Sequence, residues 1–285
     1  MHFRAPRRFF AILAASALVL MAVGVVISNV GLHREYILMA TTTSTRDTGL
    51  LSVLLPAFRD ATGIEVRYIA VGTGQALDAG RRGDVDIVIV HAPMLEIQFL
   101  ADGQGLCRNQ VMFNRFVIVG PRDDPASVAQ ATSAIDAFRR IAENESLFES
   151  RADNSGTHTK ELELWALAGL SASTFGSWYE RTSQGMAATL TISNERDSYT
   201  LSDDGTWFAL EGALPFLRLL YSTDEPVLQN VYSVIPVNPA VHSNVVFEKA
   251  VAFARWLIGL DAQRLIAEFT VNGHPIFTPA PVGGC

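Results

Sequence analysis

The sequence predicts an α/β fold arranged in two lobes. From Tyr36 onwards, short apolar runs rich in β-branched residues alternate with segments of helical periodicity, which is typical of a mostly parallel sheet flanked by helices. Two long apolar runs, at 111–125 and 230–239, leave the first set of elements and return to it. We therefore expect two lobes joined by two hinge strands, with a cleft between them.

The elements of the first lobe form three strand–helix pairs. Each predicted strand is a short β-rich run, such as "IEVRYIAV", and each predicted helix has apolar residues at helical spacing. The strands are predicted at 36–40, 64–71 and 85–90, and the helices at 48–63, 74–83 and 94–103.

The second lobe follows the first crossing run. Within it we expect a helix at 134–144, a strand at 146–150 and a helix at 159–169. Beyond the second crossing run, helices at 244–260 and 262–273 are predicted to pack back on the first lobe. The resulting division assigns 36–118 and 236–285 to lobe I, and 119–235 to lobe II.

The first 35 residues have a different character. Arginines within the first ten residues precede an uncharged run at 9–32, which is the pattern of an export signal. Val26 and Ser28 offer small residues for cleavage after Ser28, whereas the length of the run also suits an uncleaved membrane anchor. With either alternative, residues 1–35 are a signal peptide or anchor and the rest of the chain is periplasmic or otherwise extracytoplasmic.

The chain of 285 residues contains two cysteines, Cys107 and Cys285, and has a formal net charge of −7. In an oxidising compartment the cysteines can pair, and the sequence leaves the paired and the free state open. Two sulfurs with no histidine nearby do not suit a metal site, and we expect no cofactor. The negative charge argues against a nucleic-acid partner, which would need a basic face.

Three loops share an unusual composition. "TTTST" at 41–45, "VGTGQAL" at 71–77 and "SRADNSGTH" at 150–158 each supply hydroxyl groups and precede a predicted helix. The N-terminus of a helix presents free N–H groups and the positive end of the helix dipole, so it binds anions without a cationic side chain. Together with Arg151, the loops predict a pocket for a small, ionised oxyanion.

The balance of donors and acceptors narrows the class of anion. Hydrogen phosphate carries a proton and benefits from an acceptor, whereas sulfate, molybdate and tungstate carry none at neutral pH. The loops are rich in donors, while Asp47 and Asp153 can serve either as helix caps or as acceptors. This balance favours a tetrahedral dianion without a proton and does not choose among the three.

Structural explanations compete for parts of these loops. Ser44 and Asp47 form the S-x-x-D pattern that caps a helix, although one cap needs one hydroxyl and the loop has five. Arg151 can pair with Asp153 or Glu149 in a surface salt bridge of small value. Other notable residues have structural explanations. His158 fits the first turn of a helix better than a ligand or base, and His91 ends a strand, from where it can line the cleft and reach the ligand. Asp84 and Asp86 open a strand and are assigned no chemistry, and Trp165 fits the core.

Four motifs in succession resemble the tungstate-binding periplasmic proteins of ABC transporters, which are related to the molybdate-binding proteins. The motifs are "TTTSTRDTGLL", "AVGTGQALDAGRRGDVDIVIVHAP", "VMFNRFVIVGPRDDP" and "SRADNSGTHTKELELW". The resemblance runs from about Tyr36 to the C-terminus. It implies the fold of a type II periplasmic binding protein and the delivery of tungstate to a membrane permease.

The resemblance also implies which residues bind the anion. The first loop would donate from its hydroxyls, the second from a threonine and its glycine backbone, and the third from an arginine and further hydroxyls. The implied ligands are Thr42, Thr43, Ser44, Thr73, Arg151, Ser155 and Thr157. One segment departs from the family, because Asp204 stands in "DDGT" where the family tends to have arginine.

The sequence thus predicts a monomeric receptor that binds tungstate in the cleft between its lobes. Alternatives that stay open are a receptor for molybdate or sulfate and a membrane-tethered sensor of oxyanions. A hydrolase is disfavoured, because Ser155 and His158 lie three apart on a loop and the chain has no G-x-S-x-G motif. We therefore expect a binding protein and not an enzyme.

Overall fold

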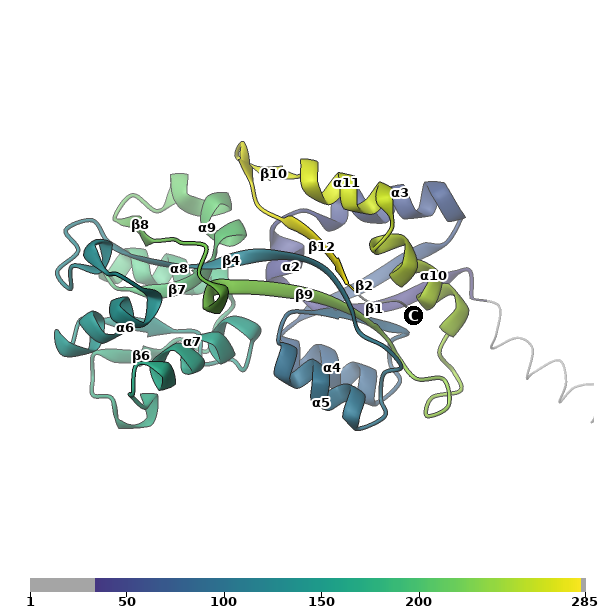
Figure 1. Cartoon of the computed structure of the whole chain (residues 1–285), viewed down its shortest axis with the longest axis horizontal. Coiled ribbons are helices and arrows are strands. Elements are labelled where there is room, and N and C mark those ends of the chain that lie inside the picture. Colours follow the sequence, from purple (N-terminus) through teal and green to yellow (C-terminus); the bar gives the residue numbers. More distant parts are fainter. Residues whose placement is uncertain (1–33, 283–285) are drawn as a thin grey trace, which may run out of the picture. The chain divides into compact units, whose positions relative to one another are not determined.

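The computed structural model describes residues 34–282, and from Tyr36 onwards these residues form one compact unit (Figure 1). The helices and strands of this unit are divided between two α/β lobes, which two long strands connect. The predicted α/β fold, with mixed sheets and flanking helices, is confirmed. Residues 1–33 of the predicted signal or anchor, as well as Cys285, lie outside the described residues.

Lobe I is organised by a sheet in which the first three strands are parallel. Strand β1 (Tyr36–Thr42) lies between β2 (Glu65–Val71) and β3 (Ile87–Val90). The sheet continues from β3 through β9 (Gln229–Pro236) and β4 (Asn109–Pro121) to β12 (Thr278–Val282), and these pairings are antiparallel.

Helices cover both faces of this sheet (Figure 1). On one face a hydrophobic core includes Phe58 of α3 (Leu51–Thr62), Phe253 of α10 (Phe247–Leu257) and Ile266 of α11 (Leu260–Glu268). On the other face, a second core includes Leu77 of α4 (Thr73–Arg81) and Phe99 of α5 (Pro93–Ala101). The central strand β3 is apolar and fully buried, as expected of a strand covered on both sides, whereas β2 at the edge is largely exposed.

Strand β4 passes from one lobe to the other. Its first half pairs with β9 in lobe I, and its second half pairs with β7 (Thr200–Asp203) and β8 (Leu217–Tyr221) in lobe II. On β4, Met112 packs in the core of lobe I and Phe116 in the core of lobe II. At the second connection, Leu228 just before β9 packs in lobe II, and Tyr232 on β9 packs in lobe I. The lobe boundaries expected from the sequence, at 118/119 and 235/236, stay a prediction because both strands run on through the change.

Lobe II surrounds a core rich in aromatic side chains. Trp165, predicted to be core, is 1% exposed and packs edge-on against Phe138 and Phe148. The other elements of the lobe are α6 (Ala134–Glu143), β5 (Phe148–Ser150), α7 (Gly156–Leu167), β6 (Tyr179–Arg181), α8 (Met186–Arg196) and α9 (Asp204–Leu210). Short 3-10 turns lie at Val128–Gln130, Ala172–Thr174, Glu211–Ala213 and Pro226–Leu228.

The C-terminal part differs from the sequence-based expectation. The helix predicted at 262–273 ends at Glu268, and a short hairpin of β10 (Thr270–Val271) and β11 (His274–Pro275) follows. Asn272 and Gly273 both have positive φ, which a helix does not allow but a tight hairpin turn requires. The predicted helix was therefore too long, because the apolar pattern continues beyond Glu268 into the strands and turn of the hairpin.

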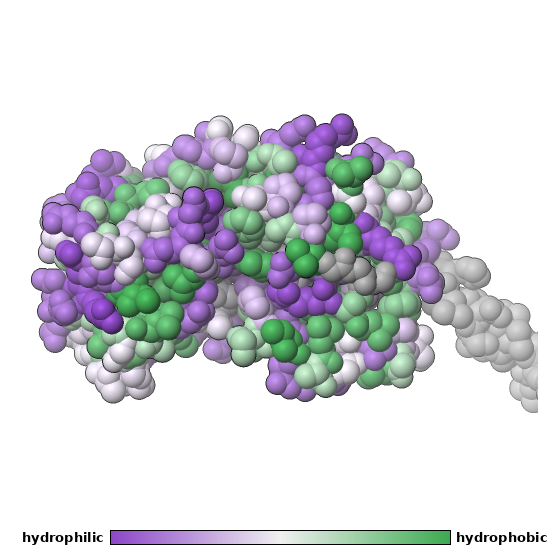
Figure 2. All heavy atoms as spheres, viewed as in Figure 1, coloured by the Kyte–Doolittle hydropathy of each residue, from purple (hydrophilic) through white to green (hydrophobic). Residues whose placement is uncertain are grey.

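Two further features concern the chain's setting. In the described part of the chain no helix has both the length and the apolar character needed to cross a membrane. Cys107 is disulfide-bonded, and the partner that the sequence offers, Cys285, lies outside the described residues. Figure 2 shows hydrophobic side chains interspersed with hydrophilic ones over the visible face of both lobes.

Candidate functional site

The loops that follow β1, β2 and β3 open at one edge of the lobe I sheet. Thr42 at the end of β1 pairs in register with Val71 at the end of β2, and Thr41 pairs with Ile89 on β3. Because the strands are parallel, the residues that follow them lie side by side beyond their carboxyl ends. This edge brings together the first two predicted anion loops and, after β3, His91.

The hydroxyls of the first loop form a hydrogen-bonded cluster. The Oγ1 atom of Thr42 lies 3.1 Å from Ser44 Oγ and 2.7 Å from Thr45 Oγ1, and it accepts a hydrogen bond from the Thr45 N–H. Thr42 is thereby the N-cap of α2 (Thr43–Asp47). The predicted cap by Ser44 is wrong, because Ser44 lies inside α2, where its side chain is directed to a neighbour and not to the backbone.

The second loop places one hydroxyl at the start of a helix. Gly72 is the N-cap of α4 in extended conformation, and Thr73 is its first residue. The Thr73 side chain is fully buried, and its Oγ1 atom has no hydrogen-bond partner. A buried hydroxyl without a partner is costly, which makes Thr73 Oγ1 a candidate donor to a bound ligand.

The third loop carries the arginine that the sequence singled out. Arg151 is 3% exposed, its Nη2 lies 2.5 Å from Asp153 Oδ2, and its Nη1 donates to Thr157 Oγ1 at 3.3 Å. The Nε atom is buried without a partner. The alternative salt bridge with Asp153 exists, but it is not a surface pair, because the Arg151 side chain is buried and the Asp153 side chain is only 19% exposed.

The same loop organises the start of α7. Ser155 is the N-cap and accepts from the His158 N–H at 3.2 Å, while Asp153 Oδ1 accepts from the Ser155 N–H at 3.1 Å. His158 therefore lies in the first turn, as predicted, and its ring accepts from the Asn154 N–H. Both carboxylate oxygens of Asp153 accept hydrogen bonds from within the loop, so this residue supports the loop.

The two lobes meet at the N-termini of three helices. A Cβ atom on Gly72, before α4, would lie 3.8 Å from the Asp153 carbonyl oxygen, and one on Gly185, before α8, would lie 4.0 Å from Thr43 Oγ1. A Cβ atom on Gly156, the first residue of α7, would lie 2.6 Å from His91 Nδ1. Only glycine fits at this last position. The contacts bring all three predicted loops to one cleft.

This arrangement suits an anion better than a cation or an acid–base reaction. The cleft offers the N–H groups of three helix N-termini, hydroxyls and one buried guanidinium. Three donor atoms in this region are buried without partners: Thr41 Oγ1, Thr73 Oγ1 and Arg151 Nε. Within residues 34–282, no group of three His, Cys, Asp or Glu side chains is placed to hold a metal ion.

His91 is the residue whose importance the sequence understated. It is 3% exposed, its ring stacks on that of Tyr232, and its two nitrogens face Asn230 Oδ1 and Ser44 Oγ. Burial lowers the pKa of His91 to about 4, opposed by the bond to Asn230 and assisted by the charge of Arg151. The available signal was its place directly after the strand "VDIVIV", at the edge that carries the other loops.

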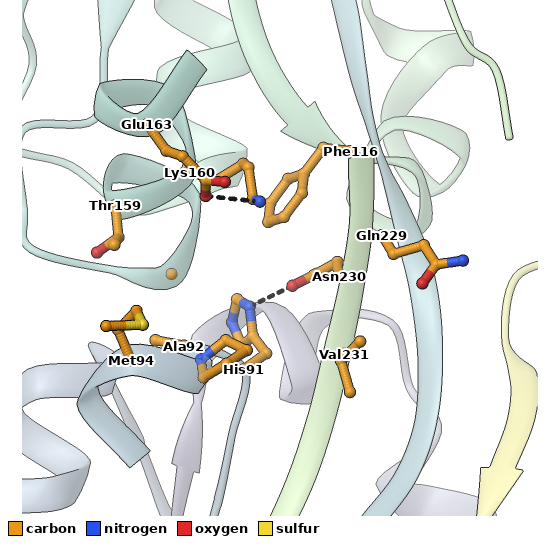
Figure 3. A pocket seen from close by; sticks show the side chains of 12 residues that line it. His91, Ala92, Met94, Phe116, Thr159, Lys160, Glu163, Gln229, Asn230 and Val231 are labelled. Carbon is orange, nitrogen blue, oxygen red and sulfur yellow. Dashed lines mark hydrogen bonds and ion pairs between the residues drawn. The ribbon is translucent and has the colours of Figure 1, made fainter. Parts of the chain in front are cut away.

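A cavity of about 260 Å³ lies next to His91 (Figure 3). Its walls come from both lobes and from the crossing strands, as the side chains of Met94, Thr159, Phe116 and Asn230 show. None of the predicted anion ligands, all of which lie in the described residues, lines this cavity. His91 thus belongs both to the hydroxyl-rich edge and to the wall of the neighbouring cavity.

Among the buried carboxyl groups of lobe II, Glu161 and Asp204 have their pKa values raised to about 7. Burial raises the pKa of Glu161 on α7 to about 7, although Ser150, Tyr179 and Trp165 all hydrogen-bond to it. Ser150 directly precedes Arg151 in the chain. Its hydrogen bond to Glu161 therefore fixes the start of the loop that carries the arginine.

Asp204, the residue that departs from the family pattern, is the second of these carboxyls. It is the first residue of α9 and 7% exposed. Burial raises its pKa to about 7, the charge of Asp203 adds to the shift, and a hydrogen bond from the Arg115 N–H opposes it. Asp204 Oδ1 is buried without a partner.

The two aspartates of the "GDVDIVIV" segment make structural contacts. Asp86 is fully buried and accepts hydrogen bonds from the Leu38 and Val246 N–H groups, at 2.6 and 2.7 Å. Asp84 is exposed and paired with Arg82. Neither reaches the cleft loops through these bonds, in agreement with the sequence-based assignment.

Comparisons with known proteins agree on one kind of molecule. Residues 30–260 match the PBP superfamily domain. The tungstate-binding protein TupA of Peptoclostridium acidaminophilum is 42% identical over 247 residues, which cover 85% of each chain. TupA of Campylobacter jejuni is 36% identical over 238 residues, which cover 82% of this chain and 87% of that protein.

Solved structures give the same result. A structure of the tungstate ABC transporter from Geobacter sulfurreducens has 45% sequence identity and a TM-score of 0.76, covering 82% of this chain and 98% of that one. The tungstate-binding protein TupA from Desulfovibrio alaskensis G20 has 42% identity and a TM-score of 0.77, covering 87% and 99%.

Proposed function

Because this chain belongs to the periplasmic binding protein (PBP) superfamily, and within it to the family of the tungstate-binding proteins, we propose that it is the tungstate receptor of an ABC transporter. The anion binds in the cleft between the lobes. The receptor then delivers it to the permease of the transporter. It acts by binding and release, and it is not an enzyme.

One observation carries the proposal at the level of chemistry. Thr73 Oγ1 and Arg151 Nε are buried donors without partners, and they belong to the two loops that face each other across the cleft. A tetrahedral oxyanion supplies the acceptors that both need, and the helix N-termini beside them stabilise its charge. The proposed ligands are those expected from the family: Thr42, Thr43, Ser44, Thr73, Arg151, Ser155 and Thr157.

The acceptor balance supports an anion without a proton. Asp153, the carboxylate nearest to Arg151, uses one oxygen for the arginine and the other for the Ser155 N–H. A hydrogen phosphate ion carries a proton that needs an acceptor, in a cleft whose unpartnered groups are mostly donors, and a proton left unpaired costs about 1–3 kcal/mol. We therefore expect tungstate and molybdate to bind and phosphate to be rejected.

The location and partners follow from this function. A receptor for an ABC transporter works outside the cytoplasm, which agrees with an export signal or anchor at residues 1–35. We propose a monomer that closes on its ligand, because the two loops that hold the anion come from the two lobes of one chain. Closure then presents the permease with a shape that depends on the ligand.

Calorimetric titration of the purified protein tests the proposal. Tungstate, molybdate, sulfate and phosphate are titrated in turn at constant ionic strength. We expect tight one-to-one binding of tungstate, comparable or weaker binding of molybdate, and no heat with phosphate. Absence of binding for all four anions would overturn the proposal, and tight binding of sulfate alone would replace tungstate as the ligand.

A further inference from the structure

A chain of hydrogen bonds joins the hydroxyl loop to both crossing strands. Ser44 Oγ lies 3.2 Å from His91 Nε2, His91 Nδ1 lies 2.7 Å from Asn230 Oδ1, and Asn230 Nδ2 donates to Asn114 Oδ1 at 2.8 Å. Asn230 lies on β9 and Asn114 opposite it on β4. Figure 3 shows the His91–Asn230 bond at the wall of the cavity. The chain therefore leads from the proposed anion loop to the connection between the lobes.

The direction of each hydrogen bond follows from the chemistry of the groups. The Asn230 amide nitrogen faces two oxygens, those of Asn114 and the Tyr232 hydroxyl, so the amide oxygen is the atom that faces His91. An amide oxygen only accepts, which places the ring proton of His91 on Nδ1. In the neutral ring Nε2 is then an acceptor, and Ser44 must donate its single hydroxyl proton to it.

We infer that His91 is a positioning residue for the anion site, which commits the Ser44 hydroxyl proton to the ring and ties the hydroxyl loop to the crossing strands. This inference rests on the proposed function and refines it. Ser44 then serves the anion through its backbone and through the placement of Thr42, and its hydroxyl is not an anion donor. The same ring forms the surface on which Gly156 of lobe II closes.

The surroundings of the ring support a fixed, neutral state. His91 is stacked on Tyr232 with ring centroids 4.7 Å apart, and burial keeps it uncharged at neutral pH. The charged and titratable groups around it, element by element, are Arg151 and Asp153 before α7, Lys160 and Glu163 on α7, Glu96 on α5, and Tyr232 on β9. Arg151 pairs with Asp153 and Lys160 pairs with Glu163, so their charges largely offset one another at the ring.

Nitrogen NMR of the histidine rings tests the direction of the bonds without any anion. With assignment by His91→Gln, we expect the His91 ring of the purified protein to be the neutral tautomer with the proton on Nδ1 from pH 6 to 8. The Asn230→Asp variant replaces the amide by a carboxylate, so His91 should become protonated within this pH range. A proton on Nε2 in the wild type, or an Asn230→Asp variant whose His91 titrates as in the wild type, overturns the inference.

A double-mutant cycle with tungstate tests the link to binding. We expect His91→Gln to weaken tungstate binding by about threefold to tenfold, since it releases the orientation of the loop. Ser44→Ala in the His91→Gln background should add little, because both residues act as one unit. His242→Gln is the matched control: this histidine is partly buried and bonds to Gln104, and its loss should leave affinity unchanged.

Three outcomes of the cycle are decisive. Non-additive losses support the inference, and additive losses of about tenfold for each residue make Ser44 an anion donor and overturn it. Unchanged affinity in His91→Gln also overturns it. If His91→Gln melts at a lower temperature than the wild type, Asn230→Asp replaces it in the cycle, because this substitution barely changes the side-chain volume. The tungstate affinity of Asn230→Asp must then depend on pH differently from that of the wild type. Failure of the wild type to bind any oxyanion refutes the proposed function, while the NMR result stands or falls separately.

Discussion

The two sides of the proposed anion cleft differ in their chemistry. On the lobe I side the proposed donors are neutral: the hydroxyls of Thr42 and Thr73 and the backbone of Ser44 are buried, and burial keeps His91 uncharged. Lobe II offers the buried guanidinium of Arg151, held by the carboxylate of Asp153. In this proposal the formal charge comes from lobe II alone, so we expect only the closed form to apply it to the anion together with the neutral donors of lobe I.

The same difference separates the lobes in their response to pH. The titratable group at the lobe I side of the site, His91, has its pKa lowered to about 4 and is silent near neutrality. In lobe II the pKa values of Glu161 and Asp204 are raised to about 7 by burial. We therefore expect changes of pH near 7 to act through Glu161 and Asp204 in lobe II and not through His91.

The largest effect is expected for Asp204→Asn and concerns stability. Folded Asp204 keeps its proton up to about pH 7, whereas the unfolded residue loses its proton near the ordinary aspartate pKa of 3.8. Between about pH 4 and pH 7, the folded state therefore binds one proton more than the unfolded state. As pH rises through this range, Asp204 lowers the free energy of unfolding by up to about 4 kcal/mol. Asparagine does not titrate, so the variant lacks this effect. The stability advantage, meaning the free energy of unfolding of the variant minus that of the wild type, should rise by roughly 2–3 kcal/mol between pH 5 and pH 8.

Urea unfolding of Asp204→Asn and the wild type at the two pH values measures this advantage. Asp60→Asn is the matched control, because Asp60 is on the lobe I surface with a side chain that is 75% exposed. An advantage that is the same at pH 5 and pH 8 would show that Asp204 does not retain a proton in the folded state.

The second effect is expected for Arg151→Ala and concerns affinity. The variant removes the formal charge of lobe II and leaves Asp153 without its partner. Loss of a hydrogen bond to a charged group predicts tungstate binding weaker by about 1.5–3 kcal/mol, on the order of 10- to 150-fold. Arg218→Ala, which removes an equal charge from a half-exposed position, controls for net charge in the same calorimetric titration. Equal losses in both variants would mean that lobe II contributes only general electrostatics.

The third effect concerns the contact between the lobes and is expected for Gly156→Ala. The new methyl group would lie 2.6 Å from His91 Nδ1 and 2.8 Å from the His91 carbonyl oxygen, so one lobe must move. Overpacking of this kind costs about 1–3 kcal/mol, which should appear as weaker tungstate binding. Gly212→Ala, where an added Cβ meets nothing within 4 Å, is the control. Wild-type affinity in Gly156→Ala would show that binding does not need the closed contact seen here.

The sequence predicted the elements of this cleft better than the links between them. Strand–helix alternation placed β1, β2 and β3 and their loops, because apolar periodicity and turn residues are local properties. The role of His91 depends on Asn230, which lies 139 residues further along the chain, and on Gly156 across the cleft. Contacts of that kind depend on packing, and no local pattern encodes them. The sequence pattern placed the helix cap at Ser44 and not at Thr42 for a related reason, since several hydroxyls in a row offer equivalent capping patterns.

The smallest effect is expected for Thr73→Val, and it separates binding from stability in lobe I. Valine keeps the shape of the side chain and removes a hydroxyl that is buried without a partner. If this hydroxyl donates to the anion, tungstate binding weakens by about 0.5–1.5 kcal/mol. The protein without anion should be as stable as the wild type or more stable, because an unpaired buried hydroxyl is lost. Thr73→Ser should restore binding, and Thr191→Val, on the exposed side of α8, should change neither quantity. Weaker binding together with lower stability would mean that Thr73 acts in packing, and the neutral donors of lobe I would then lie elsewhere in the hydroxyl loops.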